Sequence, residues 1–177
     1  MFLRSLLKPG QARAAGERLY AATVEAARAP PLYAELGAPD TPDGRFEVYT
    51  LHVLLVLQRL RGAGPKASAV AQACFDAYLS GLDNGLRELA VGDLAVGKTM
   101  RRLGEAFYGR GKALDAALAA LPDPAELEAL LGRTVFSGAE AADPAPLARR
   151  ILVLRAVLAG APVEVLLAGD LPWRAAA

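Results

Sequence analysis

The chain has 177 residues, of which 54 % are hydrophobic and 22 % charged, a composition too apolar for an intrinsically disordered protein. Its 20 basic and 19 acidic residues leave a net charge of +1, so no overall basic field favours nucleic-acid binding. The single cysteine, Cys74, excludes an internal disulfide and a zinc site of several thiolates.

Aromatic residues make up only 6 % of the chain, so Ala and Leu supply most of its hydrophobicity, and both favour helices. Pro and Gly divide the sequence into helix-length pieces. We expect helices over residues 11–29, 46–60, 65–80, 83–91, 95–121, 124–131, 144–159 and 162–168. Without alternating strands or an internal repeat, the predicted fold is an all-α, single-domain bundle of residues 1–177, with residues 1–10 flexible.

The segment 46–61 is the most apolar, and we expect it to be the central buried helix. It is too long for a strand, which rarely exceeds about 10 residues. The sequence TPDG at residues 41–44 predicts a turn before it and offers Thr41 or Asp43 as a helix cap. Its polar members fall near one stripe and predict a narrow solvent-facing edge: Glu47, Thr50, Gln58 and Arg61.

The long helix near 95–121 is amphipathic. Its apolar residues step by threes, fours and one seven: Met100, Leu103, Phe107, Leu114, Leu118 and Leu121. Gly109 and Gly111 interrupt it, and each costs about 0.5–1 kcal/mol relative to Ala. The close approach of another helix or of a partner's backbone would explain them, and the sequence leaves both explanations open.

Residues 92–99 match the phosphate-binding pattern G-x-x-x-x-G-K-[ST]. That chemistry needs a Gly-rich loop after a buried strand, whereas residues 86–90 indicate a helix, and Asp93 would repel phosphate. We therefore interpret residues 92–99 as a joint between two helices. A nucleotide-binding, P-loop-like protein is kept as the alternative function.

His52 is the only histidine, and it lies on the predicted central helix. One histidine cannot build a zinc site, and no Cys-x-x-Cys-His signal for haem attachment is present. We expect His52 to be hydrogen-bonded within the core and Cys74 to be a small core residue. No cofactor and no metal are predicted.

Charges are segregated along the chain. A basic run on the long helix contains Lys98, Arg101, Arg102, Arg110 and Lys112, and an acidic cluster precedes it at Asp76, Asp83, Glu88 and Asp93. The basic run is either a solvated helix face or a docking strip for an acidic partner or an anionic surface. Segregated charge favours oriented docking.

Several segments resemble the ubiquinol–cytochrome c chaperone family: TPDGRFE at 41–47, QACFD at 72–76, LRE at 86–88 after Asp83, VGDLAVGK at 91–98 and AFYGR at 106–110. Together they cover residues 40–121. The resemblance implies a helical assembly factor without enzymatic activity that binds newly made cytochrome b and supports assembly of the ubiquinol–cytochrome c reductase. It also implies the ribosome or a small partner subunit as further partners.

Mitochondrial members of that family carry a presequence and a membrane-associating segment, neither of which is visible here. The most apolar stretch, residues 151–168, contains Arg155, Pro162 and Glu164 and does not predict a membrane span. We therefore expect a bacterial-type, cytoplasmic protein that makes peripheral contact with the inner membrane, where the apolar and cationic residues 1–8 offer a contact.

Charge clustering and the resemblance together indicate ten partner-binding residues: Asp83, Arg87, Glu88, Asp93, Lys98, Arg101, Arg102, Phe107, Tyr108 and Arg110. We expect the acidic residues, Arg87 and the two aromatics to complete one surface around the 92–97 joint, with Asp93 capping the long helix. Phe107 is expected to pack inward and Tyr108 to lie at the surface. In the alternative interpretation, Asp83, Arg87 and Glu88 form ion pairs that hold the helices together.

Overall fold

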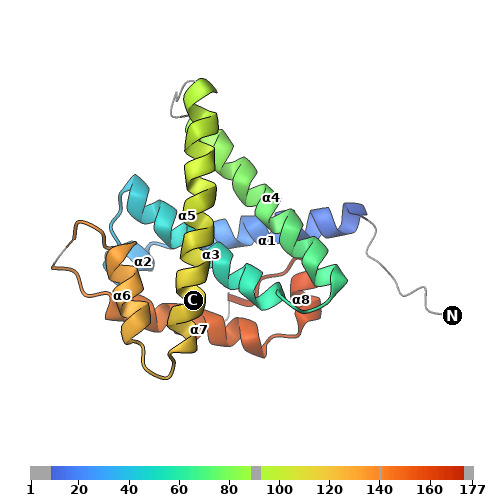
Figure 1. Ribbon diagram of the computed structural model, residues 1–177. Coiled ribbons are helices and arrows are strands. Elements are labelled where there is room, and N and C mark those ends of the chain that lie inside the picture. The colour runs from blue at the N-terminus through green and yellow to red at the C-terminus, as the bar shows by residue number, and fades with distance from the viewer. Residues whose placement is uncertain (1–8, 89–92, 140, 174–177) are drawn as a thin grey trace.

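The computed structural model describes residues 9–88, 93–139 and 141–173. All regular elements in these ranges are helices: α1 (Pro9–Ala27), α2 (Pro31–Ala34), α3 (Pro42–Leu60), α4 (Pro65–Glu88), α5 (Asp93–Ala119), α6 (Ala125–Arg133), α7 (Ala145–Gly160) and α8 (Val163–Leu167) (Figure 1). The predicted all-α bundle is therefore confirmed. The expectation that residues 1–10 are flexible falls mostly on residues outside the described ranges.

The predicted break between residues 80 and 83 is wrong, because α4 continues as one helix to Glu88. Gly81, which lies where the break was expected, has a packing role within the helix. A Cβ atom at this position would lie 1.8 Å from the hydroxyl oxygen of Tyr20, so glycine makes room for a tyrosine of α1. The single turn of α2, which follows Pro30, was not predicted.

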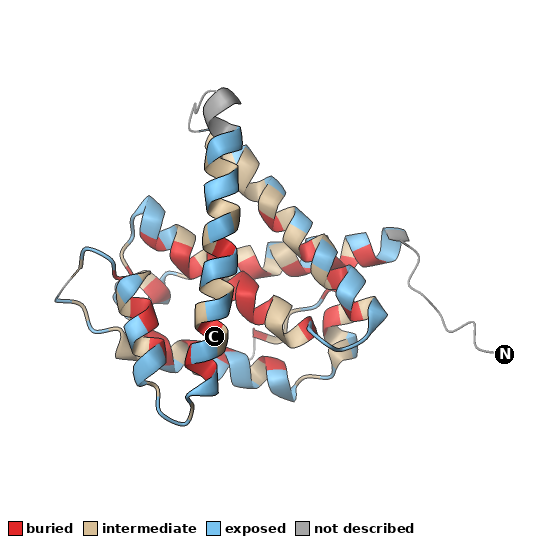
Figure 2. Cartoon of the chain, viewed as in Figure 1, coloured by how far each residue is buried: buried red, intermediate tan, exposed pale blue. Residues whose placement is uncertain are grey.

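Helix α3 lies at the centre and packs against α1, α4, α5 and α7. Figure 2 shows buried residues along its length, and Leu51, Val53 and Leu55 are almost completely inaccessible. Full burial of one such side chain stabilises the fold by about 1.5–3 kcal/mol. The predicted cap is also confirmed, since the backbone N–H of Gly44 donates to Oγ1 of Thr41 at 3.1 Å.

The predicted solvent-facing edge of α3 is wrong in its first half, because Glu47 and Thr50 are buried. Both oxygens of the Glu47 carboxylate accept hydrogen bonds from the Arg110 guanidinium of α5, at 2.5 and 3.0 Å. Thr50 shares a hydrogen bond of 3.0 Å with the hydroxyl of Tyr78 in α4. In this half of α3 the polar stripe therefore faces neighbouring helices and not solvent. Arg110 and Tyr78 provide the hydrogen bonds that water was expected to provide.

His52 is a buried, hydrogen-bonded core residue, as expected. Its Nδ1 lies 2.8 Å from the carbonyl oxygen of Val48, and its ring stands edge-on to Trp173 at a centroid distance of 5.3 Å. Trp173 in turn donates from Nε1 to the carbonyl oxygen of Leu154 at 3.1 Å. Burial lowers the pKa of His52 to about 4, against the opposing effect of the Val48 hydrogen bond, so the imidazole is neutral near pH 7.

Helices α4 and α5 form an antiparallel pair whose connected ends project beyond the other helices, while their opposite ends diverge as they reach the body of the protein (Figure 1). At the body, α4 packs against α1 and α3, and α5 packs against α6. The outward side of α5 is mostly exposed (Figure 2). This pair of helices therefore presents an accessible surface that carries the predicted binding residues.

We expect Arg110→Ala to lower the free energy of unfolding by about 3 kcal/mol, because it leaves the Glu47 carboxylate buried without its partner. The double variant Glu47→Leu/Arg110→Met should recover most of this loss, since it removes both charges. Urea unfolding measures the difference. Arg13→Ala, which breaks an exposed pair with Glu17, is the control and should be neutral. A fully stable Arg110→Ala protein would contradict the structural role.

We also expect His52 to destabilise the fold in acid. Its unfolded-state pKa of about 6.5 lies above its folded-state pKa of about 4, so the unfolded state binds the extra proton first as the pH falls. Relative to His52→Phe, the wild-type protein should lose about 3 kcal/mol between pH 6.5 and pH 4. Urea unfolding at several pH values measures the two slopes. Parallel pH profiles for both proteins would rule out the proton effect.

Candidate functional site

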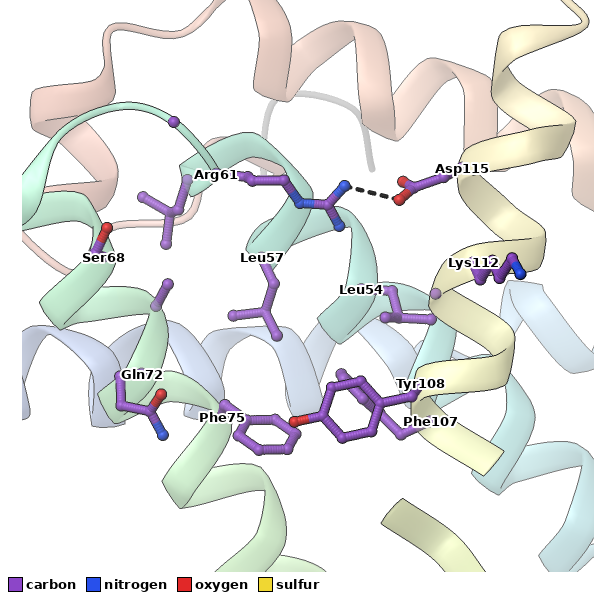
Figure 3. A pocket seen from close by; sticks show the side chains of 14 residues that line it. Leu54, Leu57, Arg61, Ser68, Gln72, Phe75, Phe107, Tyr108, Lys112 and Asp115 are labelled. Carbon is purple, nitrogen blue, oxygen red and sulfur yellow. Dashed lines mark hydrogen bonds and ion pairs between the residues drawn. The ribbon is translucent and has the colours of Figure 1, made fainter. Parts of the chain in front are cut away.

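An open groove with a volume of about 560 Å³ lies between the C-terminal end of α3, the N-terminal half of α4 and the C-terminal half of α5 (Figure 3). Its lining is mostly apolar and includes Leu54, Leu57, Ala71, Phe75, Phe107 and Tyr108. The two leucines approach from α3, opposite the aromatic side chains of α4 and α5 (Figure 3). Three helices thus build one apolar groove that is open to solvent.

One wall of the groove consists of three aromatic rings. Phe75 and Phe107 have ring centroids 5.0 Å apart, and Tyr108 lies 6.3 Å from Phe75 and 6.1 Å from Phe107. Phe107 is only 5 % exposed, whereas Tyr108 is 70 % exposed, which confirms their predicted orientations. Phe107 therefore supports the wall from inside, and Tyr108 presents an amphipathic ring to the surface.

Charged residues close one end of the groove. Nη1 of Arg61 lies 2.7 Å from Oδ2 of Asp115, and Gln58 donates to Oδ1 of the same carboxylate at 2.7 Å. Burial acts to raise the pKa of Asp115, but the hydrogen bonds from Arg61 and Gln58 outweigh it and hold the pKa below its usual range. Lys112, which is exposed on the rim, adds a positive charge beside the apolar lining.

The two glycines in the middle of α5 have different surroundings. A Cβ atom on Gly111 would lie 3.2 Å from Cδ2 of Leu54, so this glycine permits the close approach of α3 and α5. A Cβ atom on Gly109 would meet nothing within 4 Å. The explanation from a neighbouring helix therefore applies to Gly111 and not to Gly109.

The structure distributes the basic residues of α5 over two sides of the helix. Tyr108 and Lys112 line the groove, and Arg101 lies on the same face of α5, about two turns before Tyr108. Arg102 and Arg110 instead line a hollow beside the start of α3 and the end of α6. Lys98, Arg101 and Arg102 are exposed, whereas Arg110 is held by Glu47.

The acidic side of the predicted surface lies on the projecting part of α4. Nε of Arg87 lies 2.8 Å from Oδ2 of Asp83 in an ion pair within α4, and Glu88 is exposed at its end. Residues 89–92 and the side chain of Asp93 fall outside the described part of the chain, so the expected cap by Asp93 is untested. Tyr108 lies about 16 Å along α5 from Gly97, at about 1.5 Å per residue. The single surface expected around the joint is therefore divided into an acidic outer part and an aromatic inner part.

Sequence reasoning did not identify Leu54, Leu57 and Asp115 as part of a site. The two leucines were assigned to the core, and Asp115 belonged to no motif. Phe75 did fall within a resembling segment, QACFD, but nothing in its spacing connects it to Phe107, which lies on another helix. Only the packing of α4 against α5 and α3 brings these side chains together.

The alternative of a nucleotide-binding P-loop is not supported by the backbone. Residues 93–99 belong to the continuous helix α5, and the element before them is the helix α4 rather than a strand. A P-loop needs a glycine-rich loop after a buried strand, whereas Gly97, Lys98 and Thr99 lie beyond the first turn of α5. In the described residues no group of three or more His, Cys, Asp or Glu side chains is arranged to hold a metal ion.

The reactivity expected of a catalytic cysteine is also missing from the site. Cys74 is completely buried, and burial raises the pKa of its thiol to about 12, so it is protonated at physiological pH. It is a core residue, as predicted.

Residues 34–173 match the family described as ubiquinol-cytochrome C chaperone. The chain belongs to this family. Among solved structures it is similar to the crystal structure of the Cbp3 homolog from Brucella abortus, with 38 % sequence identity, a TM-score of 0.81, and coverage of 92 % of this chain and 90 % of that one. No curated protein sequence matches it.

Membership of this family indicates a chaperone or assembly role. Among the described helices, none combines the length and apolarity that crossing a membrane requires. The apolar groove, rather than a reactive centre, is the feature of the structure that suits such a role.

We expect Gly109→Ala to raise the free energy of unfolding by about 0.5–1 kcal/mol, because alanine favours a helix interior and the added Cβ has space. Gly111→Ala should gain less, since its Cβ would press on Leu54. Thermal unfolding of both variants provides the comparison. A destabilised Gly109→Ala protein would show that this position needs a glycine for another reason.

Proposed function

We propose that this protein is a non-enzymatic assembly factor that binds newly made cytochrome b and supports assembly of the ubiquinol–cytochrome c reductase. The observation that carries the proposal is the open apolar groove with the exposed ring of Tyr108 at its edge. Family membership and the similarity to the Cbp3 homolog support it.

An apolar groove suits a membrane-protein client because the client's helices expose aliphatic side chains before they enter the bilayer. The leucines Leu54 and Leu57 and the aromatic wall can cover such side chains and remove them from water. Tyr108 adds a ring whose apolar face and hydroxyl suit an interface that is partly wet. The groove is open to solvent, so a client segment can enter and leave without unfolding the protein.

Positive charges on the face of α5 that carries Tyr108 would orient the client as it binds. Arg101 and Lys112 lie on the face of α5 that carries Tyr108, and Lys98 lies one turn before Arg101. Cations at the rim attract acidic residues in the loops of a membrane protein, or anionic lipid headgroups, and affect association rate and orientation more than affinity. This arrangement agrees with a peripheral position at the cytoplasmic side of the inner membrane.

The projecting part of α4, with Asp83 and Glu88, lies apart from the groove and offers a second surface of opposite charge. We assign it to a further partner, such as the small partner subunit or the ribosome that the family resemblance implies. A client and a second partner would then occupy different ends of the same pair of helices.

The proposal predicts that variants of the groove lose client binding without losing stability. Tyr108→Ala removes the exposed ring, and Ala71→Phe fills the groove. Each variant should weaken capture of cytochrome b about tenfold, equivalent to about 1.4 kcal/mol. The charge reversal Arg101→Glu/Arg102→Glu should also reduce capture. The measurement is binding of cytochrome b from a cell-free translation reaction to the immobilised protein, together with the melting temperature.

Matched controls separate specific from general effects. Ala116→Phe adds the same ring to an exposed position of α5 outside the groove, and Arg149→Glu/Arg155→Glu reverses two exposed charges on α7. Both controls should retain capture. Full capture by the groove variants would overturn the groove as the client site. If both charge reversals weakened capture equally, the loss would come from net charge and not from the basic face of α5.

A further inference from the structure

A second cavity, with a volume of about 190 Å³, lies on another side of α3, between α1, α2, α7 and the C-terminal segment that ends at Trp173. It shares no lining residue with the groove. Its apolar lining includes Ala26, Leu32, Leu154, Leu171 and Trp173, and its polar lining consists of Glu25, His52 and Arg150. The client proposal makes no use of this cavity.

His52 is the buried polar group of the cavity, with 1 % of its surface accessible. A carbonyl oxygen can only accept a hydrogen bond, so the contact of 2.8 Å with Val48 requires the proton to sit on Nδ1. A neutral imidazole has one N–H, and this contact uses it. Nε2 therefore carries a lone pair, and among the described residues the hydrogen bond of the His52 ring is the one made by Nδ1.

The neutral state of His52 is maintained at physiological pH because burial lowers its pKa to about 4 and the positive charge of Arg150 acts in the same direction. His52, which lines the cavity, consequently offers a hydrogen-bond acceptor at Nε2 over the whole neutral range. A ligand that satisfies it must donate a hydrogen bond, and a ligand with only a carbonyl or ether oxygen would place two lone pairs against each other.

The size of the cavity limits the ligand to about one ring. An apolar protein cavity of about 150 Å³ takes a benzene molecule, and the present cavity of about 190 Å³ has room for a six-membered ring with one substituent. Leucine side chains and the ring of Trp173 form apolar walls for such a ring, and His52 supplies the polar contact.

We propose that this cavity binds a compact alcohol or phenol, one ring in size, whose hydroxyl donates a hydrogen bond to Nε2 of His52. The inference is independent of the proposed function. A bound ligand would connect α1, α2, α3, α7 and the C-terminal segment, because residues from all of them line the cavity.

The intrinsic fluorescence of Trp173 provides the test, because it is the single tryptophan of the chain and lines the cavity. The full-length protein is titrated with cyclohexanol and with cyclohexanone, which have nearly the same shape and differ in whether they donate a hydrogen bond. Because the ketone carbonyl absorbs weakly at wavelengths that excite tryptophan, the same titrations of free tryptophan are subtracted as a control. We expect a saturable change with cyclohexanol and an affinity at least tenfold weaker for cyclohexanone.

Two variants on one helix locate the binding. Ala26→Leu adds volume to the lining and should weaken cyclohexanol binding at least tenfold, whereas Ala21→Leu, at an exposed position of α1 outside the cavity, should bind like the wild type. In His52→Phe the preference for the alcohol over the ketone should disappear.

Three results would overturn the proposal: no saturable response to cyclohexanol, equal affinities for alcohol and ketone in the wild-type protein, or unchanged binding by Ala26→Leu. The comparison of alcohol with ketone uses the unaltered chain, so it decides the role of His52 even if His52→Phe does not fold.

Discussion

The burial of α3 among four other helices is the constraint on which the rest of the structure depends. Polar side chains on the buried faces of a helix cannot be left to water, so each needs a partner within the protein. Glu47 forms an ion pair with Arg110 of α5, Thr50 is hydrogen-bonded to Tyr78 of α4, and His52 is hydrogen-bonded to the backbone of Val48. The first two contacts help to hold α5 and α4 against α3, and the groove lies where these three helices meet.

Helix α5 combines a structural side with the side proposed to bind the client. Its inward side carries Phe107 and the Arg110 guanidinium, which tie it to α4 and α3, and its outward side carries Tyr108 and the exposed cations. Neighbouring residues on a helix point in directions about 100° apart, so Phe107 and Tyr108 serve opposite purposes although they are adjacent. A substitution of Phe107 would therefore disturb the packing of the groove wall, whereas a substitution of Tyr108 changes only the side chain exposed at the edge of the groove.

The proposed function requires a protein that exposes apolar surface without associating with itself. Among the described residues only Tyr108 and Val153 are large hydrophobic side chains with high exposure. The remaining apolar surface of the groove is recessed between helices, and Lys112 and the Arg61–Asp115 pair border it. Recessed apolar surface with a charged border offers contacts to an inserted client segment but little to a flat neighbouring surface.

The sequence by itself determined the helical class, because Ala and Leu content, Pro and Gly positions and the apolar periodicity of α5 all act within one segment. It also determined the family, through segments such as LRE and AFYGR, and the orientations of Phe107 and Tyr108, which follow from one helical stripe. The tertiary structure decided what depends on contacts between segments. The helix pattern marked Glu47 as polar but could not reveal that Arg110, 63 positions later, would bury it. Likewise, the predicted break between residues 80 and 83 is absent, and Gly81 leaves room there for Tyr20 of α1. The groove and the cavity beside His52 belong to the same category, since each is lined by at least three helices and no local pattern records how helices distant in sequence pack.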